Sequence, residues 1–233
     1  MNLLKMDKQS ETSSHVFFFR GDPTKTELKK GKRPHKFACR LKAVRCKEIS
    51  PITHKQCSRK TVIGTGYCWQ HLLMFYHLRI GPSTITKGDK SIGYGLFAAG
   101  PPGSVVFRKG EVVVYYGGDQ CSEKTMNDRY GEFTAPYGLE GSGKKGSKTN
   151  YDGACNRGVG TLVNHKPDLK ANTRFSMTTV DGEKIPCLRA SKSIRANQEL
   201  FVDYGRDYRM NGRLHGRHDT RSIHRGHPHW YYK

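Results

Sequence analysis

Apolar residues are scarce in this 233-residue chain, and acidic residues are scarcer still. Hydrophobic types make up 35% of the sequence, below the usual share of a globular protein, which indicates ordered parts joined to polar segments. No stretch approaches the ~20 consecutive apolar residues that a membrane-spanning helix needs. The first residues also lack a long apolar run ending in small residues, so the sequence predicts no secretory signal.

Positive charge dominates what is present. The chain has 41 Lys and Arg against 20 Asp and Glu, a formal net charge of +21. The excess is concentrated in two segments: residues 22–60 carry 13 Lys and Arg against 3 acids, and residues 209–233 carry 6 Lys and Arg and 5 His against 1 Asp. Such segments favour a polyanionic partner, nucleic acid first, although a merely solvated surface is the alternative.

The seven cysteines are an odd number, and they cluster early in the chain. This argues against the disulfide framework of a secreted protein and for a reducing compartment with a metal. A C-x10-C-x10-C-x2-H pattern is formed by Cys46, Cys57, Cys68 and His71. Three thiolates and an imidazole suit tetrahedral zinc, with Cys39 as a competing ligand and buried, inert thiols as the alternative. The segment resembles a short zinc-binding motif of some large DNA viruses and scattered cellular proteins.

Composition divides the chain into four parts. Residues 1–33 are basic and lack apolar periodicity, so we expect them to be mostly disordered, with Phe17–Phe19 as an apolar exception able to dock elsewhere. Residues 34–80 form the zinc module, whose apolar end at 69–80 suits a short helix. From 81 to 208, short apolar runs are broken by Gly and Pro, which predicts a mostly β domain of small sheets. Residues 209–233 are a basic, His- and Arg-rich tail.

Four short segments follow one another in a fixed order within residues 81–208. They are Gly93-Tyr94-Gly95-Leu96-Phe97-Ala98, Val114-Tyr115-Tyr116-Gly117, Leu162-Val163-Asn164-His165 and Gln198-Glu199-Leu200-Phe201-Val202-Asp203-Tyr204-Gly205. This ordered set resembles the SET domain of protein lysine methyltransferases. The resemblance implies several small curved sheets, with the Asn164 and Tyr204 segments threaded as a pseudoknot, an exception to the rule against threaded chains.

The resemblance also assigns residues to the chemistry. Tyr204 and Tyr115 match the catalytic tyrosines that line the lysine channel, with Tyr116 as the neighbour on the opposite strand face. The S-adenosylmethionine site is matched by Gly93, Tyr94, Gly95, Asn164, His165 and Tyr204. Phe175 and Val202 match the positions that set product specificity, that is, how many methyl groups the lysine receives. Because neither side chain carries a hydroxyl, we expect dimethyl- or trimethyl-lysine as product, unless Phe175 is simply a core aromatic.

The chain departs from the family pattern near the cofactor. Lys166-Pro167 replaces the usual residues after the Asn-His pair, Thr161 stands where an arginine is common, and Asn172 follows two extra residues. No cysteine follows Cys187, so no cysteine-rich segment after the domain closes the lysine channel. The aromatic tail at residues 230–232 is the candidate to close it instead.

The sequence thus predicts an S-adenosylmethionine-dependent protein-lysine N-methyltransferase with a zinc module. We expect a histone tail or another basic protein as substrate, nucleosome or DNA contact through the basic segments, and a nuclear location. One alternative is a methyltransferase of a nonhistone protein; another is a zinc-containing nucleic-acid-binding protein with an inactive SET domain. The zinc module can present cations to phosphates or pack on the SET domain, and the sequence leaves both open.

Overall fold

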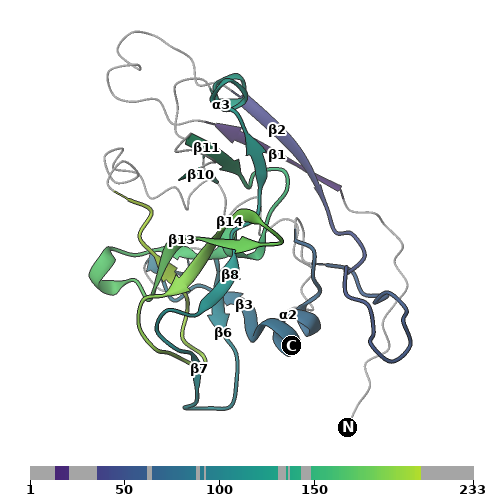
Figure 1. The fold of residues 1–233 in the computed structure, drawn as a ribbon, viewed down its shortest axis with the longest axis vertical. Coiled ribbons are helices and arrows are strands. Elements are labelled where there is room, and N and C mark those ends of the chain that lie inside the picture. The colour runs from purple at the N-terminus through teal and green to yellow at the C-terminus, as the bar shows by residue number, and fades with distance from the viewer. Residues whose placement is uncertain are drawn as a thin grey trace.

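The computed structural model is built of small β-sheets with few helices (Figure 1). It describes residues 14–20, 36–61, 65–87, 90–91, 93–130, 135, 137–142 and 148–205. The basic tail at 209–233 and its aromatic end, expected to close the lysine channel, therefore lie outside the described residues. Within them, no helix is long and apolar enough to cross a membrane.

A five-stranded sheet in the order β12-β16-β13-β14-β8 forms the centre. Its strands are β12 (Asn164–His165), β16 (Phe201–Val202), β13 (Thr173–Val180), β14 (Glu183–Ala190) and β8 (Val112–Tyr115). β13 and β14 form an antiparallel hairpin whose turn, Asp181-Gly182, has positive φ at both residues, as a two-residue hairpin turn requires.

Smaller sheets surround this centre. They are β3 (Leu78–Pro82) with β6 (Tyr94–Ala98), β7 (Val105–Phe107) with β15 (Ile194–Arg195), β4 (Thr86–Lys87) with β5 (Lys90–Ser91), and β11 (Lys148–Asp152) between β9 (Asp119–Cys121) and β10 (Gly138–Ser142). The helical elements are α2 (Trp69–Tyr76), α3 (Glu123–Tyr130) and the 3-10 turns η2 (Val159–Leu162) and η3 (Asp168–Lys170).

Strand β16 lies between two strands that precede it in the chain. It pairs in parallel with β12, where Asn164 faces Phe201 and His165 faces Val202. It also pairs in parallel with β13, where Thr173 faces Val202. The end of the described domain is therefore inserted between earlier segments, as the expected pseudoknot requires, and this insertion brings the Asn-His segment next to the residues before Tyr204.

The main hydrophobic core joins the central sheet to β3, β6 and α2. Leu72 of α2 is 1% exposed and belongs to the same core as Leu96 and Leu188. The helix ends where His77 takes a left-handed conformation (φ 52°), and β3 begins at the next residue. The expected helix at 69–80 is thus confirmed for its first eight residues, and the segment with the Cys/His cluster packs through this helix on the domain that follows it.

Two features differ from the expectations. Residues 14–20 form strand β1 (Ser14–Arg20), which pairs along its whole length with β2 (Lys36–Lys42), so disorder does not extend through this part of residues 1–33. Cys39 of β2 forms a disulfide with Cys155, 116 residues away, and therefore does not compete for the metal. The disulfide lies in a second core that β2 shares with Tyr130 of α3 and Tyr137.

Candidate active site and metal cluster

A buried carboxylate organises the expected cofactor region. Glu199 is 4% exposed and accepts hydrogen bonds from Ser83 Oγ (2.8 Å), Thr84 N (2.6 Å) and Asn164 Nδ2 (3.0 Å). Burying a carboxylate is costly unless hydrogen bonds compensate for the lost water. These donors come from segments far apart in the sequence, so the carboxylate fixes the three segments to one another.

The Gly93-Tyr94-Gly95 segment runs directly beside this carboxylate. A Cβ atom at Gly95 would overlap the Glu199 carboxylate and approach Asn164 Nδ2, so only glycine fits this position. Gly93 is buried and has a φ of 145°, a conformation that favours glycine. Gly95 is therefore required by the Glu199 side chain and Gly93 by its backbone conformation, while the predicted role of both in binding S-adenosylmethionine stays a prediction.

Asn164 and His165 make up strand β12, and their side chains have different hydrogen-bond partners. Asn164 Nδ2 donates to Tyr94 O (3.0 Å) as well as to Glu199, which ties the pair to the glycine segment. His165 Nδ1 accepts a hydrogen bond from the backbone N–H of Tyr204 (3.1 Å). Since an accepting Nδ1 carries no proton, this bond assigns the neutral imidazole with its hydrogen on Nε2.

Tyr204 follows β16 and turns its ring toward the same region. Its hydroxyl donates to Val163 O (2.6 Å), and its ring centroid lies 5.3 Å from that of His165 and 6.5 Å from that of Phe175. The position of the hydroxyl oxygen is therefore set by the backbone carbonyl of Val163, the residue before β12. A tyrosine oxygen fixed in this way can accept a hydrogen bond or a weak C–H contact from a substrate.

The two consecutive tyrosines at the end of β8 lie on opposite faces, as strand alternation requires. Tyr115 is 45% exposed, whereas Tyr116 is 7% exposed and donates its hydroxyl to Tyr137 O (3.2 Å). The ring of Tyr116 lies 5.7 Å from that of Phe175 in an edge-to-face arrangement. Tyr115 is thus exposed on one face, and Tyr116 packs on the other, where it contacts Phe175, the neighbour of Tyr204.

The two residues matched to product specificity lie in different surroundings. Phe175 is half-buried and packs against the main core between Tyr116 and Tyr204. Val202 is 1% exposed and belongs to the core itself. Phe175 therefore contacts the edge of the tyrosine site, while Val202 contributes packing beneath it.

Close backbone contacts hold η2 against the end of β8. A Cβ atom at Gly158 would overlap the carbonyl of Tyr116, and one at Gly160 would overlap the carbonyl of Tyr115. Gly117 has a φ of 74° and faces Gly158. Glycines on both sides thus let the segment that leads to Asn164 pass directly over the strand that carries both tyrosines.

The departures from the family pattern have local structural solutions. Lys166 places its ammonium 3.7 Å from the ring centroid of Phe201, a cation–π contact. The two extra residues are taken up by η3, which starts after Pro167. Asn172 then donates to Glu199 O and accepts from Phe201 N, both at 2.8 Å, so its amide brackets the backbone on either side of Leu200.

Sequence reasoning missed several of these residues. The sequence pattern assigns no role to Glu199, Ser83 or Thr84. A carboxylate placed directly before the buried run Leu200–Val202 was the available signal, because an acid next to a core strand needs donors. The sequence does not show which residues donate hydrogen bonds to Glu199, because Thr84 is 115 residues away along the chain.

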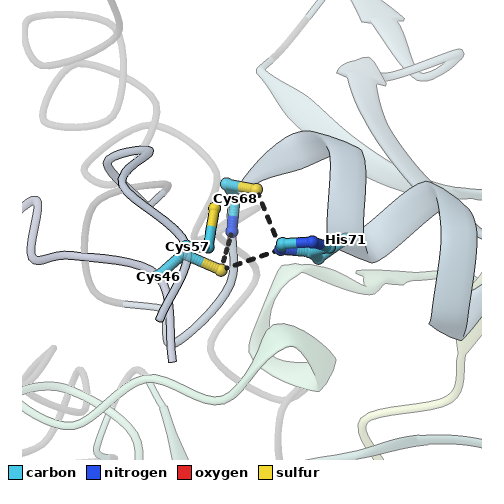
Figure 2. Close-up of side chains that lie close together, drawn as sticks. All are labelled: Cys46, Cys57, Cys68 and His71. Carbon is cyan, nitrogen blue, oxygen red and sulfur yellow. Dashed lines mark hydrogen bonds between the residues drawn. The ribbon is translucent and has the colours of Figure 1, made fainter. Parts of the chain in front are cut away.

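The four predicted metal ligands come together at one point. Figure 2 shows the side chains of Cys46, Cys57, Cys68 and His71 converging, and their ligand atoms all lie within 4.8 Å of one another. His71 Nδ1 is 3.2 Å from the sulfur of Cys46 and 3.5 Å from that of Cys68. Around a tetrahedral zinc ion, bonds of ~2.0–2.3 Å place the ligand atoms roughly 3.5–3.8 Å apart, so the cluster fits this ion.

Two elements supply these ligands. Cys46 and Cys57 lie on the two arms of a hairpin, and Cys68 and His71 lie at the start of α2, where Cys68 is the N-cap. Burial raises the pKa of the Cys68 thiol, with the neighbouring Cys46 adding to the effect. A bound metal cation lowers the pKa of a cysteine thiol, because the thiolate is the form that ligates metals.

Comparison with known proteins agrees with this architecture. Residues 93–205 match the family model of the SET domain. No curated protein matches the chain. Among solved structures it is similar to an autoinhibited polycomb repressive complex 2 (ctPRC2) bound to S-adenosylmethionine, with 26% identity, 55% of this chain and 15% of that chain covered, and a TM-score of 0.42.

A second structure, the polycomb repressive complex 2 of Chaetomium thermophilum, gives 25% identity, coverage of 56% of this chain and 15% of that chain, and a TM-score of 0.44. This chain thus spans about 15% of the length of these larger proteins. The small sheets and the inserted strand β16 lie within or next to the region that matches the SET domain model, residues 93–205. A Cys/His cluster lies on the N-terminal side of that region.

We expect purified wild-type protein to contain about one zinc ion per chain, measured by elemental analysis. Cys57→Ser removes one donor and should lose most of the metal. Cys121→Ser is the matched control, because Cys121 is a buried thiol outside the cluster and its loss leaves all four donors in place. A wild-type protein without zinc, or a Cys57→Ser variant that keeps its full content, would contradict the assignment.

Proposed function

We propose that this chain is an S-adenosylmethionine-dependent protein-lysine N-methyltransferase that acts on a histone tail in the nucleus. The observation that carries the proposal is the meeting of the glycine segment, Asn164 and Glu199 next to Val163, whose carbonyl accepts the hydrogen bond from the Tyr204 hydroxyl. In the SET domain the corresponding segments bind the methyl donor and the lysine. A second proposal follows from the donor set: the Cys/His cluster holds zinc.

The chemistry demands orientation more than acid–base catalysis. S-adenosylmethionine supplies a methyl group on a positively charged sulfur. The lysine amine, whose reference pKa is ~10.4, must arrive neutral so that its lone pair is available. A site of fixed polar groups that excludes water favours the neutral amine and holds it in line with the methyl group.

Tyr204 is placed to orient that amine. Its O–H is directed at Val163 O, so the oxygen can accept a hydrogen bond from the amine while the lone pair of the nitrogen points elsewhere. Tyr115, on the exposed face of β8, is the proposed second wall of the lysine channel. In this reading Phe175 lies behind Tyr204 and limits the room around the amine.

Charge bears on the choice of substrate. A chain with a net charge of +21 repels a free basic tail at long range. A histone tail in a nucleosome lies next to DNA, whose phosphates attract the same positive charge. The net charge therefore supports a substrate presented on chromatin over an isolated basic peptide, and it supports the nuclear location that goes with such a substrate.

Transfer of a labelled methyl group from S-adenosylmethionine to nucleosomes, free histones and a lysate depleted of histones tests this function. The proposal expects the nucleosome to be the best substrate. Transfer only to proteins of the depleted lysate would indicate a nonhistone substrate. No transfer to any of the three, with a folded protein that binds the methyl donor, would indicate an inactive SET domain.

Tyr204→Phe should reduce turnover by ~10²-fold or more while leaving folding nearly unchanged, because one preorganised polar group at the reacting centre is removed. The matched control is Tyr151→Phe. Tyr151 lies on strand β11, and its hydroxyl also donates to a backbone carbonyl, that of Lys184. The measurement is the steady-state rate on the best substrate. Similar turnover in both variants and the wild type would refute the role of Tyr204.

Phe175→Tyr should shift the product toward monomethyl-lysine. An added hydroxyl beside Tyr204 can hold a water molecule that restricts rotation of the methylated amine, whereas phenylalanine leaves room for further transfers. Mass spectrometry of the product at enzyme excess makes the measurement, with mainly dimethyl- or trimethyl-lysine expected for the wild type. Lowered stability with an unchanged product distribution would show that Phe175 serves only the core.

A further inference from the structure

Residues 45–60 form a hairpin whose two arms meet at the metal cluster. The backbone N–H of Cys46 donates to Arg59 O (2.9 Å), and that of Cys57 donates to Glu48 O (2.8 Å). Cys46 and Cys57 therefore face each other across the arms, and a metal bound by both ties the hairpin together. In Figure 1 this segment lies beside α2 at the edge of the molecule.

Exposed basic side chains follow both arms. They are Arg45, Lys47, Lys55, Arg59 and Lys60. The one carboxylate within residues 45–60, Glu48, is half-buried and accepts a hydrogen bond from the Tyr76 hydroxyl (3.1 Å). Arg45 and Lys60 are directly opposite each other, and like charges in that position destabilise a strand pair. The arrangement therefore favours a polyanion that neutralises both arms.

Arg45 is held in place by the hairpin itself, and Lys47 by a segment next to it. Arg45 donates from Nε to Cys57 O (2.8 Å) and from Nη2 to Gln56 O (2.6 Å), which fixes the guanidinium across the opposite arm. The aliphatic part of Lys47 lies against Gly66. Positions fixed before binding lose less conformational entropy when a ligand arrives, so the charged face is preorganised.

The tip of the hairpin is apolar and rigid. Ile52 is 87% exposed and Ile49 is 60% exposed, although turns usually present polar residues. Ser50 closes the turn: its N–H donates to Lys55 O (3.0 Å), and its carbonyl accepts from His54 N (2.9 Å). The structure thus holds an isoleucine outward at the end of a fixed turn, between two charged arms.

We propose that this hairpin binds double-stranded DNA, with its cations on the phosphates and Ile52 as a wedge in the minor groove. Proteins that bind the minor groove insert apolar side chains between base steps and kink the duplex. An acidic protein surface would also attract the cations, but it has no stacked bases between which the Ile52 side chain could insert. A membrane surface calls for a broader apolar face than one turn provides.

This inference rests on the hairpin and not on methyl transfer. DNA binding can therefore fail while methyl transfer succeeds, and the reverse also holds. The full-length, zinc-loaded protein is used throughout, so that the contribution of the hairpin is measured as a difference between variants that share every other basic segment.

The charge test compares two triple variants by fluorescence anisotropy on an end-labelled duplex over a range of salt. Lys55→Ala/Arg59→Ala/Lys60→Ala removes hairpin cations, and Lys109→Ala/Lys184→Ala/Lys192→Ala removes the same charge from exposed positions of the SET domain. Each phosphate contact contributes ~0.9 to the slope of log affinity against log salt, so the hairpin variant should flatten the slope by about 2 to 3. The control should keep the wild-type slope. Equal losses in both variants would overturn the proposal.

The wedge test measures DNA bending by energy transfer between dyes at the two ends of the duplex. Wild type should bend the duplex by ~20–90°. Ile52→Ala should abolish most of the bend while keeping the salt slope. Leu169→Ala removes an apolar side chain that is 94% exposed elsewhere, and it should bend the duplex like wild type. An unbent duplex with the wild type, or bending unchanged in Ile52→Ala, would overturn the wedge.

Two competitors complete the experiment. Duplex RNA of the same sequence and vesicles of phosphatidylserine and phosphatidylcholine are each added to the preformed DNA complex. Unlabelled duplex DNA is the reference, and the proposal expects it to compete better than either of them at equal phosphate concentration. Stronger competition by RNA or by vesicles would identify a different ligand for the hairpin and overturn the assignment to DNA.

Discussion

The buried carboxylate of Glu199 is the constraint on which the rest of the site depends. A carboxylate at 4% exposure must be surrounded by donors, and it obtains them from the turn at Ser83-Thr84 and from Asn164. Satisfying one buried charge therefore fixes three chain segments. The same carboxylate explains why Gly95 has no side chain, and it lies two residues before β16, the strand inserted between β12 and β13.

The metal cluster extends this organisation to the N-terminal side. His71 and the buried Leu72 are neighbours on α2, so one helix contributes both a predicted ligand and a side chain of the main core. Packing on the SET domain is therefore part of what the module does. The hairpin that carries Cys46 and Cys57 points its exposed cations away from that contact, so a structural use of the module and a DNA-binding use are compatible.

Local pattern was enough to predict part of this structure. The short strands after residue 81, the helix at Trp69–Tyr76 and the meeting of Cys46, Cys57, Cys68 and His71 follow from periodicity, turn residues and ligand spacing. The missed features all depend on distant partners. Strand β1 needs β2, the disulfide joins Cys39 to Cys155 across 116 residues, and Glu199 needs Thr84. Pairings of this kind are not encoded in any one segment, and cysteine connectivity in particular cannot be deduced from spacing.

The most direct test is calorimetric titration of S-adenosylmethionine into wild type and Glu199→Gln. The amide keeps the shape of the side chain but turns its own N–H groups toward donors that now lack an acceptor. The account predicts measurable binding by wild type and affinity weakened by about tenfold or more in the variant, with Glu183→Gln, an exposed position, as the unchanged control. Wild-type affinity in a folded Glu199→Gln protein would contradict the claim that this carboxylate builds the cofactor site.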